Sequence, residues 1–282
     1  MEPAVPLSVA GALRLRWLGC AGWRFEYEGQ ALLVDPWISR NPWARPPVVV
    51  EEEALFPALA ALVGHGHFDH AADLPGLTRE RDLIVYAEVG TARLLERNGV
   101  RPALLRPIAS GWRGDVGPFA LRAHPIHHVF YGFPLLLRTL WKIGLKAPRY
   151  LPLALHWPCG QALAWRIDVG GRSILHMGTA GATPYELDSI AAAGPVDVLM
   201  VALQGNDRIH EIAAAIVERL RPALVIPHHQ DDFYPPISSQ IPVAPFEDLV
   251  ARRVPGTRVH ELNCGETMEL PAGTLNKRPA GV

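Results

Sequence analysis

The histidines of this 282-residue chain are gathered into short clusters, and this feature constrains the fold more than any other. Eight of the twelve lie within 65–70, 124–128 and 228–229. Each cluster follows a run of aliphatic residues that predicts a β-strand. Because α/β folds place ligands at strand ends, the spacing predicts that several strands end at one site.

The first cluster reads Gly64-His-Gly-His-Phe-Asp-His70 and places four potential ligands in six residues. His65 and His67, two residues apart on a turn, can point their imidazoles at one cation. Asp69 and His70 can serve a second cation nearby. Imidazole and carboxylate are ligands that zinc, iron and manganese accept. The alternative is a polar turn without a metal.

The order of the predicted elements indicates mixed sheets with helices outside them. A meander of three strands opens the chain and a helix over 51–60 follows, after which strands and helices alternate. The expected strands are 13–18, 23–27, 31–34, 83–86, 119–123, 162–168, 173–176, 196–201, 223–226, 258–262 and 267–270. The other expected helices are 89–97, 184–193, 209–220 and 245–252.

The His-x-His-x-Asp-His run resembles the signature of the metallo-β-lactamase superfamily. LGCAGWRFEYEGQALLVDPW at 18–37 is similar to that family's opening meander, and ALVIPHHQDDF at 223–233 to its closing strand. The resemblance spans 13–233 and is closest to the branch of ascorbate-phosphate lactonases and N-acylphosphatidylethanolamine phospholipases D. It implies an α/β fold, an αββα sandwich of two mixed β-sheets with external helices. We expect one domain over 1–282, with an insert at 129–158 and a loose tail after 271.

The resemblance also implies a set of metal ligands. His65 and His67 match two ligands of a first metal, while Asp69, His70 and His229 match those of a second. The third ligand of the first metal is His128 or its neighbour His127, with the Pro-x-x-His pattern favouring His128. In the closing strand, Pro-x-His favours His229 over His228. One or two divalent ions are expected, with zinc favoured over iron or manganese.

Thr179 departs from the family pattern. The run Gly178-Thr-Ala-Gly181 stands where the family has Gly-Asp-Thr-Gly, whose Asp bridges two metals. A neutral hydroxyl bridges poorly, so we expect a weakened second metal, a single metal, or a substitute ligand. The candidate substitutes are His176, Asp231 and Asp232. Without the bridge, Asp69 is a candidate general base, and Asp232 a candidate for proton transfer.

Residues 129–158 form an apolar, aromatic block directly after His128. On a helix beginning near Pro134, the cations Arg138, Lys142 and Lys146 fall on one face. Three interpretations remain open. The block packs on the core or on a second subunit in a homo-oligomer, it walls an apolar substrate pocket, or its 134–146 stretch contacts a membrane surface.

Composition narrows the function. The net charge is -1, which argues against a general nucleic-acid binder. Three distant cysteines and the lack of a secretory pattern favour a cytoplasmic location, with peripheral membrane contact as the variant. No apolar run is long enough for a membrane span.

The sequence therefore predicts a metal-dependent hydrolase that activates water to cleave an ester, lactone or phosphodiester in a partly apolar, small or lipid-like substrate. The alternatives are a membrane-surface lipid phosphodiesterase and a non-catalytic metal- or ligand-binding protein with a degenerate site.

Overall fold

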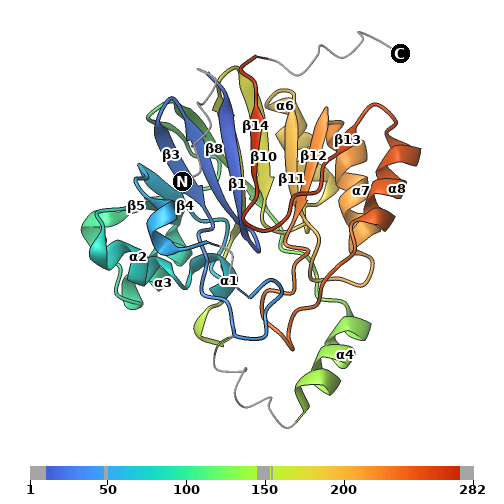
Figure 1. Ribbon diagram of the computed structural model, residues 1–282, viewed down its shortest axis with the longest axis horizontal. Helices are drawn as coiled ribbons and strands as arrows, with labels where there is room; N and C mark the ends of the chain where they lie inside the picture. Colours follow the sequence, from blue (N-terminus) through green and yellow to red (C-terminus); the bar gives the residue numbers. More distant parts are fainter. Residues whose placement is uncertain (1–10, 48–49, 145–152, 154, 274–282) are drawn as a thin grey trace, which may run out of the picture.

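Two seven-stranded β-sheets face each other at the centre of the molecule (Figure 1). A computed structural model describes residues 11–47, 50–144, 153 and 155–273. Helices cover the outer face of each sheet, so the layers run helix, sheet, sheet, helix. The predicted αββα sandwich is confirmed.

The first sheet has the order β14-β1-β2-β3-β4-β5-β6. Its strands are β1 (Leu13–Gly19), β2 (Gly22–Tyr27), β3 (Gln30–Val34), β4 (Ala60–Leu62), β5 (Ile84–Glu88), β6 (Leu105–Ile108) and β14 (Thr267–Leu270). β14 to β3 pair antiparallel and β3 to β6 parallel. The sheet is therefore mixed, and β4 delivers the first histidine cluster from its parallel half.

The second sheet has the order β13-β12-β11-β10-β9-β8-β7. Its strands are β7 (Arg113–Val116), β8 (Phe119–Ile126), β9 (Ala162–Val169), β10 (Arg172–Met177), β11 (Val198–Ala202), β12 (Leu224–His228) and β13 (Arg258–Val259). β7 to β10 pair antiparallel and β10 to β13 parallel. β8 and β12 carry the other two histidine clusters.

The helices divide between the two outer faces. Beside the first sheet lie α1 (Phe68–Ala71), α2 (Leu74–Glu80) and α3 (Val89–Arg97), and beside the second lie α6 (Pro184–Ala192), α7 (Ile209–Leu220) and α8 (Ala244–Arg253). α4 (Phe133–Ile143) stands apart, beyond the end of the sheets where α1 lies (Figure 1). None of the helices in the described part of the chain has the length and apolar character needed to span a bilayer.

The main core lies between the sheets. Trp23 and Phe25 of β2 pack in one cluster with Phe119 of β8 and Trp165 of β9, and all four are fully buried. Alternation along β1 explains the inward face, because Leu13 and Leu15 are buried while the intervening arginine is not. Two more apolar clusters fill the layers between each sheet and its helices.

One predicted element is wrong. The helix over 51–60 is a short 3₁₀ turn at Glu52–Leu55, followed by β4. Pro57 has no N–H to donate to a continuing helix, and the next residues pair with β3. Strands β6 and β7 and helices α1 and α2 were not predicted. The single domain over 1–282 and the loose tail remain predictions, and residues 274–282 lie outside the described part.

Candidate metal centre

The turn after β4 is shaped by a close backbone contact. Gly66 donates its N–H to the carbonyl of Cys159 at 2.8 Å. A Cβ at position 66 would lie 2.4 Å from the carbonyl oxygen of Pro158, so only glycine fits there. The turn therefore holds His65 and His67 on either side of Gly66, and His67 caps the start of α1, which carries Asp69 and His70.

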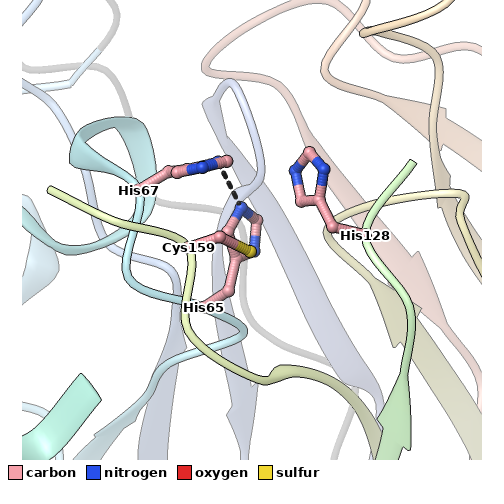
Figure 2. A group of neighbouring side chains, drawn as sticks. All are labelled: His65, His67, His128 and Cys159. Carbon is pink, nitrogen blue, oxygen red and sulfur yellow. Dashed lines mark hydrogen bonds between the residues drawn. The ribbon is translucent and has the colours of Figure 1, made fainter. Parts of the chain in front are cut away.

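Three imidazoles meet at this turn. The ring centroids of His65, His67 and His128 lie 4.7–4.8 Å apart pairwise. His65 Nε2 lies 3.0 Å from His67 Nδ1. Figure 2 shows His65 and His67 approaching from one side and His128, from the end of β8, from the other. Their ligand atoms, with Cys159 Sγ, all lie within 4.8 Å of one another, a compact set of donors for one cation.

The structure distinguishes His128 from its neighbour His127, because their side chains have different hydrogen-bond partners. His128 Nδ1 donates to the carbonyl of Val129 at 2.8 Å, which fixes the tautomer and leaves Nε2 as an acceptor. The side chain of His127 is 73% exposed and its Nδ1 lies 2.7 Å from Glu186 of α6. His128 is thus the member of the pair that joins His65 and His67.

Thr179, in the turn after β10, supports this arrangement. Its Oγ1 accepts a hydrogen bond from the backbone N–H of Val129 at 2.9 Å. A Cβ on the nearby Gly181 would lie only 2.1 Å from the carbonyl carbon of His128. The Gly178–Gly181 turn therefore packs directly against the backbone that carries His128.

A second cluster adjoins the first. His229 Nε2 lies 3.2 Å from Asp69 Oδ2, and His70 Nε2 lies 3.9 Å from the same oxygen. Cys20, at the β1–β2 turn, places its Sγ 3.6 Å from Asp69 Oδ2 and 3.3 Å from His229 Nε2. Cys20, Asp69 and His229 form the second compact donor set among the described residues.

Asp35 fixes the orientation of the His70 ring by contacting its Nδ1 atom. Its Oδ2 lies 2.8 Å from His70 Nδ1, while Oδ1 accepts the N–H of Gly64 at 2.6 Å. A carboxylate on the far ring nitrogen fixes the imidazole orientation, as in many metal sites. Asp35 and His70 are both fully buried, so one side chain ties the turn after β4 to the second cluster.

The pKa values of His65, His67 and Asp69 are shifted toward the protonation states that bind a cation. Burial, with the neighbouring imidazoles, holds the pKa of His65 well below its usual range and lowers the pKa of His67 to about 4. Burial raises the pKa of Asp69, but His70 and His229 outweigh it and hold the pKa well below its usual range. Neutral imidazoles and an ionised carboxylate are the forms that bind metal.

The clusters form the floor of a cavity of about 280 Å³. Its walls are largely apolar. They include Phe68, Val129, Tyr131, Trp157, Phe233 and Ile237. Tyr131 also hydrogen-bonds Thr139 of α4 at 2.8 Å, so α4 is joined to the cavity wall.

The structure brings together His65, His67, Asp69, His70, His128 and His229. Asp232 is not among them, because its Oδ1 accepts from Ser238 at 2.5 Å. Asp231 instead accepts the N–H of Cys20 and pairs with Arg40. His176 contacts the carbonyl of Ala21. None of the three substitutes proposed for the missing bridge belongs to either donor set of the described residues.

Sequence reasoning did not assign Cys159 or Cys20 to the site. Cys159 directly follows the apolar block, about thirty residues beyond His128, and no spacing links it to the histidine clusters. Cys20 lies in the Gly19–Gly22 turn between β1 and β2. Its position at a strand end was a signal that could have placed it near the candidate site.

Comparison with known protein families identifies the family of this chain. The model described as "Beta-lactamase superfamily domain" matches residues 14–229, most of the chain. The chain belongs to the metallo-β-lactamase superfamily. The match includes all the histidines of both clusters.

Two relatives cover most of the chain. A protein of Carboxydothermus hydrogenoformans, named a metal-dependent hydrolase, is 28% identical over 92% of this chain and all of its own length. One of Polynucleobacter asymbioticus, with the same name, is 30% identical over 81% of this chain and 78% of its own.

A solved structure shares the fold. Igni18, a metallo hydrolase from Ignicoccus hospitalis, superimposes with a TM-score of 0.67 at 18% identity, covering 92% of this chain and 98% of that one. At this identity the likeness shows the fold alone.

Proposed function

We propose that this protein is a metal-dependent hydrolase that cleaves an ester, lactone or phosphodiester bond in a small, partly apolar substrate. The observation that carries the proposal is the set of three neutral imidazoles with Asp69 on the floor of an apolar-walled cavity. The name shared by the relatives supports the same class of reaction.

The donor sets fit one or two divalent cations. His65, His67 and His128 would hold the first, and Asp69, His70 and His229 the second. A bound zinc, iron or manganese ion would supply Lewis acidity to a substrate oxygen and would lower the pKa of coordinated water to near neutrality. Asp69 lies between the two sets, where its ionised carboxylate can accept a proton or orient water.

The cavity indicates the kind of substrate. Phe68, Trp157 and Phe233 supply apolar lining, and the histidines and Asp69 of the two clusters supply polar groups. Such a division suits a ligand with an apolar portion and one reacting polar group. Trp157 and Tyr131 come from the apolar block, so the substrate-pocket interpretation of that block is the one we adopt.

The test is hydrolysis of a panel of esters, lactones and phosphodiesters whose apolar portion varies in length, by protein loaded with zinc, iron or manganese. We expect turnover that rises with apolar length and is abolished by His67→Ala. His127→Ala is the matched control, because His127 is exposed and outside the cluster. Metal binding without turnover of any substrate would favour the non-catalytic alternative.

We further infer a membrane-surface variant of this function, a lipid phosphodiesterase. The apolar side of α4 and Phe130, three residues before the helix, are turned to solvent, with Phe130 80% and Trp141 85% exposed. Arg138 pairs with Asp207, and Lys142 contacts Ser239, so these two cations face the protein. Lys146 lies outside the described residues. Contact with a bilayer would therefore rest on apolar side chains more than on charge.

Co-sedimentation with vesicles of zwitterionic and anionic lipid tests this variant. Leu137→Ser with Trp141→Ser should abolish binding, while Arg138→Gln should leave it nearly unchanged. Equal sedimentation of the double variant and the natural protein would contradict the membrane function. Size-exclusion chromatography of the same variants distinguishes membrane contact from a homo-oligomer interface over α4.

A further inference from the structure

Cys159 is a thiol placed among three imidazoles. Its Sγ and the ligand nitrogens of His65, His67 and His128 all lie within 4.8 Å of one another. Figure 2 shows the Cys159 side chain crossing beside His65, opposite His128. The pattern His-x-His with a third histidine is completed here by a fourth donor from a different part of the chain.

We propose that Cys159 is the fourth protein ligand of the metal held by His65, His67 and His128. The inference rests on the proposed metal-dependent function, since it concerns the same centre. Three imidazoles and one sulfur are four donors of the kinds that zinc binds in a tetrahedron. Binding converts the thiol to a thiolate, and the proton is released to solvent as the metal–sulfur bond forms.

The backbone holds Cys159 in place for this role. Its carbonyl accepts the N–H of Gly66 at 2.8 Å, so it is joined to the turn between two of the histidines. Leu163, four residues after Cys159, donates its N–H to the carbonyl of Gly64 at 2.7 Å. The two hydrogen bonds fasten the segment around Cys159 along the His65–His67 turn. Trp157, just before it, is buried in the cavity wall.

A sulfur ligand has consequences for the choice of metal. Thiolates favour zinc and cobalt over manganese, which prefers oxygen ligands. The thiolate also brings one negative charge to a site that has Thr179 in place of a carboxylate. Catalytic zinc sites have only three protein ligands, so with Cys159 bound, water would need an expanded coordination of this metal or a position on the second metal, held by Asp69, His70 and His229.

Cobalt titration of the chelator-stripped protein tests the proposal spectroscopically. Cobalt bound to a thiolate gives a sulfur-to-metal charge-transfer band in the near ultraviolet. We expect this band in the natural protein and in Cys264→Ser, and its loss in Cys159→Ser. Cys20→Ser should retain it, because Cys20 belongs to the second cluster. Zinc affinity should fall about ten-fold or more in Cys159→Ser, with little change in manganese affinity.

The outcomes separate the inference from the proposed function. A band of natural intensity in Cys159→Ser, a band lost only in Cys20→Ser, or cobalt binding without any band would overturn the inference and leave the metal centre standing. Failure to bind cobalt at all would overturn both.

If Cys159→Ser does not fold, alkylation of the natural protein decides. We expect zinc to slow the reaction of Cys159 with iodoacetamide, as monitored by mass spectrometry. His65→Ala should abolish this protection by zinc. Equal alkylation with and without zinc overturns the inference.

Discussion

At the scale of single residues, Thr179 stands where the family pattern has a carboxylate, and its hydroxyl has a different role. Its hydroxyl accepts the N–H of Val129, the residue whose carbonyl in turn accepts from His128 Nδ1. Thr179 and His128 are both at the cavity. The hydroxyl therefore fixes the backbone that sets the direction of the His128 imidazole.

Thr179→Val is expected to weaken metal binding at the first cluster. The valine has nearly the same shape but leaves the buried Val129 N–H without a partner, which costs about 1–3 kcal/mol. The measurement is zinc affinity by competition with a chromophoric chelator. Thr179→Ser keeps the hydroxyl and should bind zinc like the natural protein; a valine variant that also does so would remove this role.

The candidate site could be predicted in part. His65, His67, Asp69 and His70 follow from local spacing, because a short turn and one helical turn determine where they point. The separation of His128 from His127 depends on Glu186 of α6, which engages only the latter. Cys159 enters through a backbone contact to Gly66, which no sequence pattern encodes.

At the scale of the elements, β8 carries an arginine that lies opposite two other arginines, near a buried histidine of the same strand. Arg122 of β8 lies opposite Arg113 of β7 and Arg166 of β9 in register. Like charges in directly opposed positions repel. Burial and these three arginines lower the pKa of His124 to about 4, with Asp168 opposing them weakly. His124 is therefore neutral in the folded protein at neutral pH.

This arrangement predicts acid sensitivity. Because the folded pKa of His124 lies below its unfolded value of about 6.5, the unfolded chain takes up the proton first as pH falls. Stability is then full above about pH 6.5 and declines toward pH 4. We expect a loss of about 1–2 kcal/mol between pH 6.5 and 5 from this group.

Urea unfolding of the chelator-treated protein at both pH values measures this loss. His124→Gln, which does not titrate, should lose less stability than the natural protein over the same range. An equal loss in both proteins would show that His124 makes no contribution to the pH dependence.

The elements themselves were predicted well where periodicity is long. α3, α7 and β14 begin and end at the expected residues. β6 and β7 were missed because they are short and carry few buried residues, and the burial of β7 alternates between exposed and intermediate. The prediction of a helix over 51–60 was wrong because it relied on the acidic residues at the start of the segment and neglected Pro57.

At the scale of the whole molecule, the site joins the two sheets. His65, His67 and Asp69 follow β4 of the first sheet, while His128 and His229 follow β8 and β12 of the second. A cation bound by both groups would link the two halves of the sandwich directly. Metal binding should therefore be coupled to the stability of the complete fold.

The most direct test is the metal content of protein purified without chelator or added metal, by elemental analysis of the natural chain, His128→Ala and His127→Ala. We predict one to two equivalents of zinc, iron or manganese per natural chain, the same for His127→Ala, and a loss of about one equivalent in His128→Ala. Natural protein that contains no metal and fails to bind added zinc, iron or manganese would contradict the account.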